Sequence, residues 1–144
     1  MRIPPLAWGL VAALAAWPTL NPAAAATYQA ALSGGAEIPP VATQASGMAV
    51  VNADPATKRI SWSVTFAGLA SVATGADIVC AGAVGVRGAG IAVGLGRGPN
   101  LQSPLTGRGK LTDAQFADLN DGGCYVNIAT DAHKLGELRG RLQP

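Results

Sequence analysis

The chain has 144 residues, with ten Lys and Arg against eight Asp and Glu and a formal net charge of +2 at pH 7. So small a charge argues against a nucleic-acid-binding surface, because phosphate contacts need clustered Lys and Arg. The basic residues of the glycine-rich middle are spread over more than twenty positions, as is typical of a solvated loop face: Arg87, Arg97, Arg108 and Lys110. We therefore expect no nucleic-acid partner.

Residues 1–26 are typical of a secretory signal peptide. Arg2 gives a positive start, residues 6–17 are apolar or small, Pro18 and Pro22 interrupt the run, and residues 23–26 are alanines. The apolar run is shorter than the roughly 20 residues that span a bilayer core, although an uncleaved N-terminal anchor is the alternative interpretation. We expect Sec-type export, to the periplasm or the exterior, with cleavage after Ala26.

Cleavage would leave a single domain, residues 27–144. These 118 residues are enough for one hydrophobic core, and the loss of Arg2 lowers the net charge to +1. We expect no membrane span after cleavage, because no further apolar run of that length follows.

Short strands and turns are predicted along this domain. In residues 59–66 every second side chain is apolar: Ile60, Trp62, Val64 and Phe66. Similar patterns predict strands at 28–32, 47–52, 76–80, 90–95, 124–130 and about 135–142. The density of glycine between positions 82 and 109 predicts loops and tight backbone approaches, and it leaves the strand boundaries there open.

One short helix is predicted after Leu111. Thr112 and Gln115 have the spacing of a capping box, and Leu111 can pack on Phe116 as a hydrophobic staple. Strands spaced roughly 8–15 residues apart, with a single short helix, indicate an all-β fold. We expect an antiparallel Greek-key β-sandwich, immunoglobulin-like or superoxide-dismutase-like.

The two cysteines, Cys80 and Cys124, are expected to form a disulfide, because exported chains meet an oxidising compartment. Closing a loop of about 45 residues stabilises a fold by on the order of 4 kcal/mol in the chain-entropy model. A metal thiolate site and a redox pair are the alternatives. The pair lacks a neighbouring histidine for a four-ligand zinc pattern, and it is too widely spaced for a C-x-x-C motif.

Five segments follow one another in a recognisable order: GGAEIPP (34–40), RISWSVTF (59–66), GADIVCAG (75–82), LTDAQFADLNDGGCYVNIAT (111–130) and GELRG (136–140). In this order and spacing they resemble the CHRD domain, first recognised in chordin, over residues 27–142. The most specific pieces are the YVN of 125–127 and GELRG. The resemblance implies extracellular interaction, but it does not carry chordin's growth-factor antagonism over to a single-domain chain.

The chain departs from the family pattern where members usually carry histidines. A His-x-His pair is replaced by Asp77 and Val79 around Ile78, and a further histidine is replaced by Ala129. Strand alternation predicts that Ile78 faces the core while Asp77, Val79 and Ala129 face away from it, together with Asn127. We interpret these four outward residues as a candidate surface site.

Metal binding and catalysis find little support in this composition. His133 is the one histidine, whereas copper and zinc prefer imidazole or thiolate ligands. Calcium through Asp77, Asp121 or Asp131 would need 6–8 oxygen ligands in a suitable loop. A hydrolase built on Asp131 and His133 lacks a Gly-x-Ser-x-Gly elbow. We expect no catalytic residue, no metal and no cofactor.

Glu137 and Arg139 are two positions apart on the last predicted strand and therefore share a face. We expect an exposed side-by-side ion pair that holds this strand, worth at most about 1 kcal/mol. The alternative is a polar recognition patch shared with Asn127.

These observations favour an exported, non-enzymatic binding or structural module of the CHRD type. Its partner is expected to be a protein, a glycan or an envelope surface. The alternative is a metal-binding or superoxide-dismutase-like protein related to the histidine-bearing family members.

Overall fold

The computed structural model describes residues 25–80 and 90–144, so most of the expected signal peptide lies outside the described residues. The described part is mostly antiparallel strand with one α-helix, which confirms the all-β prediction. The strands are β1 (Ala26–Ser33), β2 (Ser46–Ala53), β3 (Arg59–Ala67), β4 (Ala73–Cys80), β5 (Ile91–Leu101), β6 (Leu105–Lys110), β7 (Cys124–Thr130) and β8 (Leu138–Arg141). The helix is α1 (Asp113–Asn120), and a short 3-10 turn, η1 (Gly34–Ala36), follows β1.

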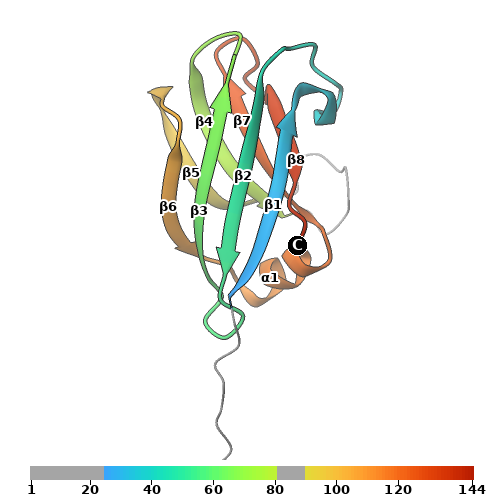
Figure 1. Cartoon of the computed structure of the whole chain (residues 1–144), viewed down its shortest axis with the longest axis vertical. Helices are drawn as coiled ribbons and strands as arrows, with labels where there is room; N and C mark the ends of the chain where they lie inside the picture. Colours follow the sequence, from blue (N-terminus) through green and yellow to red (C-terminus); the bar gives the residue numbers. More distant parts are fainter. Residues whose placement is uncertain (1–24, 81–89) are drawn as a thin grey trace, which may run out of the picture.

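All eight described strands belong to one sheet in the order β5-β4-β7-β8-β1-β2-β3-β6. The sheet curves so far that β1, β2, β3 and β6 form a front half and β4, β5, β7 and β8 lie behind it (Figure 1). The two halves join between β1 and β8, where Ser33 pairs with Arg139 and Gln29 bridges to Gln143. A Greek-key sandwich of two separate sheets is therefore not confirmed, because the sheet is continuous.

The hydrophobic core fills the space between the two halves. The front half contributes Ile60, Trp62 and Val64 of β3, as their alternation predicts. The back half contributes a matching set of buried residues: Ile78, Val126, Ile128 and Leu138. Side chains on the outer face of each half are therefore free to carry other roles.

Several glycines in the middle of the chain lie in strands β5 and β6 rather than in the predicted loops, while the close approach at Gly107 agrees with the prediction. β5 extends to Leu101, and β6 occupies residues that the glycine density assigned to loops. A Cβ on Gly107 would lie 2.5 Å from Cζ2 of Trp62, so this position accommodates the indole ring only as glycine. Residues 81–89 of the same stretch lie outside the described residues.

The last strand is shorter than the predicted 135–142. Gly136 has a φ of +135°, a conformation that L side chains rarely adopt, and its N–H donates to the carbonyl of His133 at 3.0 Å. This turn delays the start of β8 to Leu138.

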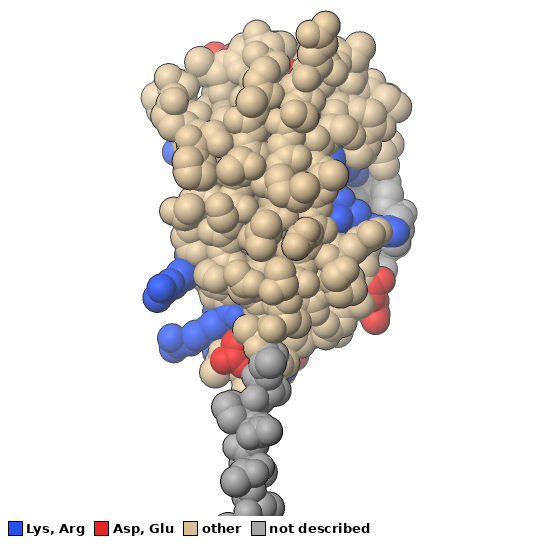
Figure 2. Space-filling model, viewed as in Figure 1, with Lys and Arg blue, Asp and Glu red and all other residues tan. Residues whose placement is uncertain are grey.

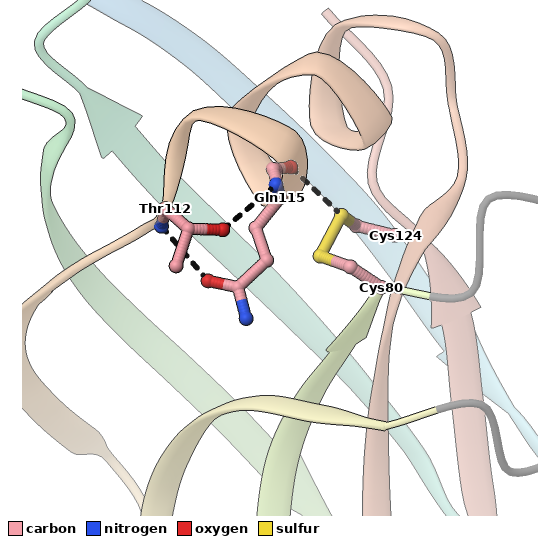
Figure 3. Close-up of a disulfide and its surroundings, with 4 residues drawn as sticks. All are labelled: Cys80, Thr112, Gln115 and Cys124. Atoms are coloured by element: carbon pink, nitrogen blue, oxygen red, sulfur yellow. Dashed lines mark hydrogen bonds between the residues drawn. A yellow bond between two sulfur atoms is a disulfide. The ribbon is translucent and has the colours of Figure 1, made fainter.

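Helix α1 begins with the predicted capping box (Figure 3). The N–H of Gln115 donates to Oγ1 of Thr112 at 3.1 Å, and the N–H of Thr112 donates to Oε1 of Gln115 at 2.9 Å. Leu111 and Phe116 are both buried, as a hydrophobic staple requires. The described residues include no helix long and apolar enough to cross a membrane.

The predicted disulfide is present and lies beside this helix (Figure 3). Cys80 and Cys124 face each other across the β4–β7 pair, 44 residues apart in sequence. Sγ of Cys124 lies 3.8 Å from the carbonyl oxygen of Gln115. The bond therefore ties two strands of the back half next to the start of α1.

Candidate functional site

The outer face of the back half contains a pocket of about 370 Å³. Three of the four predicted site residues, Asp77, Val79 and Asn127, line it. The remaining lining residues are Gly90, Ile91, Tyr125, Leu135 and Arg139. Ala129 is absent from the lining and lies two residues beyond Asn127 on β7, opposite Gly75 of β4.

Strand register explains why these side chains meet. Asp77 of β4 is opposite Asn127 of β7, which is opposite Arg139 of β8. Val79 is opposite Tyr125 in the neighbouring row. Asp77 and Val79 are each only 8% exposed, so the pocket floor is recessed rather than an open surface.

Asp77 is engaged in an ion pair with Arg97 of β5, a partner that the sequence interpretation missed. Nη2 of Arg97 donates to both carboxylate oxygens of Asp77, at 2.9 and 2.8 Å. The guanidinium lies over Gly75, where any Cβ would collide with it. A carboxylate and guanidinium thus occupy the face where the family resemblance places histidines.

Arg139 is buried, and its ion-pair partner is Glu37 of the GGAEIPP segment. Arg139 is 5% and Glu37 2% exposed, and Nε of Arg139 lies 3.6 Å from Oε2 of Glu37. The guanidinium also lies 4.0 Å from the centroid of the Tyr125 ring, within the range of a cation–π interaction. Arg139 therefore fixes one side of the pocket floor and differs from the exposed residue that was expected.

Glu137 has a separate structural role in place of the expected pair with Arg139. Its carboxylate is fully buried and accepts a hydrogen bond from the N–H of Ala70, 3.1 Å from each oxygen. Nε2 of His133 lies 3.7 Å from Oε1 of Glu137. Glu137 thus anchors the β3–β4 connection to the turn before β8.

Asn127 connects the pocket to that turn. Its Nδ2 donates to the carbonyl of Leu135 at 3.2 Å, and a Cβ on Gly136 would collide with Oδ1 of Asn127 and with the Glu37 carboxylate. Glycine at position 136 therefore lets the GGAEIPP, YVN and GELRG segments pack together. Sequence spacing alone offers no signal for this meeting, because the GGAEIPP segment is far from the other two along the chain.

The described residues contain no group of three or more His, Cys, Asp and Glu placed to hold a metal ion. His133, the one histidine, lies beside Glu137 and outside the lining of the pocket on the back half. This pocket can offer a ligand an apolar rim, the Tyr125 ring, and two fixed charges of opposite sign, the Asp77 carboxylate and the Arg139 guanidinium.

Comparison with known proteins gives one family. The model of the CHRD domain family matches residues 28–142, nearly the whole chain. No curated protein and no solved structure matches the chain. The matched range includes Glu37, Asn127 and Arg139, whose side chains meet beneath the pocket. The chain belongs to the CHRD domain family.

Proposed function

We propose that this chain is an exported, non-enzymatic binding module of the CHRD type, whose partner docks in the pocket on the outer face of the back half. The observation that carries the proposal is the combination of an apolar rim with a fixed polar floor. Ile91 and Leu135 at the rim are 57% and 70% exposed, while Asp77 and Arg139 beneath them are buried. Concave sites of this composition are typical of recognition sites.

The engagement of the polar floor supports recognition rather than catalysis. A general base must accept a proton from its substrate, but both oxygens of Asp77 already accept hydrogen bonds from Arg97. Arg139 is held between Glu37 and the Tyr125 ring. Such a floor is preorganised, which lowers the conformational entropy that a partner loses on binding.

Export is supported by two independent features. The N-terminal sequence has the charge, apolar core and alanines of a signal peptide. The Cys80–Cys124 disulfide suits an oxidising compartment, where such bonds persist. We propose that the module acts in the periplasm or outside the cell.

Site-specific photocrosslinking in the producing cell tests the docking site. A photoreactive residue replaces Leu135 or Ile91 at the rim, and a matched control replaces Met48, an exposed residue of β2 in the front half. We expect the same crosslinked species from both rim positions and its absence from position 48. Equal crosslinking at all three positions, or none at the rim, contradicts the proposed site.

Metal analysis of the purified mature protein tests the non-enzymatic part of the proposal. We expect less than stoichiometric copper and zinc and no superoxide dismutation. Stoichiometric metal that supports dismutation would instead favour the metal-binding, superoxide-dismutase-like alternative.

A further inference from the structure

Three cations gather on the outer face of the front half, around a hollow of about 570 Å³. Arg59 of β3 and Arg108 and Lys110 of β6 are all exposed and line this hollow. Basic side chains project from the side of the molecule where β6 and β3 lie, toward the end of the sheet where β1 begins (Figure 2). We call these three residues the basic cluster.

The basic cluster has no evident structural purpose. Arg59 is directly opposite Lys110 in the β3–β6 pair, and like charges in that position destabilise a sheet. Among residues 25–80 and 90–144, none of the three has an acidic group within ion-pair distance. An external anion would relieve this repulsion.

The one acidic residue in the lining of this hollow, Asp54, accepts a hydrogen bond within a turn. The N–H of Ala56 donates to Oδ1 of Asp54 at 2.8 Å, and this hydrogen bond lowers the pKa of the Asp54 carboxyl. The ionised carboxylate thus stabilises the β2–β3 turn, and the lining keeps an excess of positive charge because it has three cations and this one anion.

A row of polar side chains continues from the basic cluster across the sheet. Thr27, Asn52, Ser61 and Arg108 are successive partners on β1, β2, β3 and β6. Oγ1 of Thr27 donates to Oδ1 of Asn52 at 2.7 Å, which leaves the amide N–H groups of Asn52 available to an outside acceptor. The surface therefore combines cations with neutral hydrogen-bonding groups.

We propose that this surface binds an acidic polysaccharide. Carboxylates of the sugar chain pair with the basic cluster, where two guanidinium groups can each bind a carboxylate through two hydrogen bonds. Sugar hydroxyls bond along the row from Ser61 to Thr27. This site is on the opposite half of the sheet from the proposed docking pocket, and either can fail without the other.

Two other anionic partners fit this surface less well. Basic surfaces that dock on membranes usually add an apolar anchor, but the exposed large apolar residues of the described chain are all outside the hollow: Ile38, Met48, Val72, Ile91 and Leu135. Single-stranded nucleic acids stack on aromatic rings, and the hollow has no aromatic residue in its lining.

Titration calorimetry of the full mature protein with polygalacturonate tests the proposal. The R108S/K110S variant is compared with wild type and with Lys134→Ser, which removes an exposed cation from the turn before β8. We expect wild type and K134S to bind alike, and the double variant to bind about tenfold more weakly or worse, because two charge-assisted contacts are lost. Binding should weaken as salt rises, and neutral dextran should not bind.

Several outcomes overturn the proposal. These are no binding by the wild type, equal binding by a folded R108S/K110S variant, or equal binding of dextran. Binding to phosphatidylglycerol vesicles that depends on the basic cluster, without binding to polygalacturonate, would identify a lipid surface instead. Leu135→Ala, which alters the docking pocket on the back half, should leave polygalacturonate binding unchanged; a fall would place the polysaccharide in that pocket and overturn the proposal.

Discussion

The outer faces of the two halves treat charge in opposite ways. On the back half, Arg139 and Glu37 are buried as a pair, and Asp77 is paired with Arg97. On the front half, Arg59 and Lys110 are exposed side by side. The Glu37–Arg139 pair is buried because η1 and the residues that follow it pack against β8. The outer face of β6, in contrast, borders solvent. The Glu37–Arg139 pair is therefore structural because another segment covers it, whereas Arg59 and Lys110 are open to solvent.

Removing the disulfide of the back half should cause the largest loss of stability. The Cys80→Ser/Cys124→Ser variant should lose on the order of 4 kcal/mol of unfolding free energy, because the bond closes a loop between residues 44 apart. Urea denaturation measures the loss, and reduction of the wild type should reproduce it. Equal stability of the oxidised and reduced wild type would contradict a stabilising role for the disulfide.

Breaking the buried pair of the back half should have the next largest effect. Arg139→Leu removes the cation beside the buried Glu37 carboxylate and should cost about 3 kcal/mol. The control Arg141→Leu, at an exposed position of the same strand, should change stability by less than about 0.5 kcal/mol. The double variant Glu37→Leu/Arg139→Leu should recover part of the loss; similar effects at positions 139 and 141 would contradict the distinction between covered and open charges.

Crowding the inner face of the front half tests whether glycine there serves packing. Gly107→Ala should cost about 2 kcal/mol, because its Cβ would press on the Trp62 ring. Gly98→Ala is the matched control, since the nearest atom to its Cβ, Cδ2 of Leu101, is 3.6 Å away. Thermal unfolding should separate the two variants, and equal melting temperatures would refute the packing role.

The smallest predicted effect is a gain in stability. Lys110→Thr removes the like charge opposite Arg59 and should raise the unfolding free energy by about 0.2–1 kcal/mol. The same change should weaken polygalacturonate binding, so stability and affinity should change in opposite directions. A loss of stability on this substitution would show that Lys110 has a structural partner.

Local patterns in the sequence predict the parts of the fold that depend on near neighbours. The alternation of residues 59–66 predicts β3, and the Thr112–Gln115 spacing predicts the start of α1. Glycine predicts structure less clearly, because it has different roles at different positions. Gly107 leaves room for the Trp62 ring within a strand, whereas Gly136 adopts a positive φ in a turn. For this reason β6 was missed.

The candidate site was only partly predictable, because strand order decides which side chains meet. Alternation places Asp77 and Asn127 on the side of their strands that faces away from the core. Arg97, however, becomes the partner of Asp77 only because β5 pairs with β4. Likewise Arg59 and Lys110 are 51 positions apart and meet only because β3 pairs with β6. Neither pairing follows from the periodicity of a single strand.

The junction between β1 and β8 has a consequence for the order of folding. Gln29 near the beginning of the domain exchanges backbone hydrogen bonds with Gln143, 2.7 and 2.9 Å long, while β1 pairs with β2 and β2 pairs with β3. During synthesis the front meander can form early, whereas the curved sheet closes only after residues 138–143 have emerged. Until then the apolar side of the meander is uncovered, and a partly made chain is the species most exposed to aggregation.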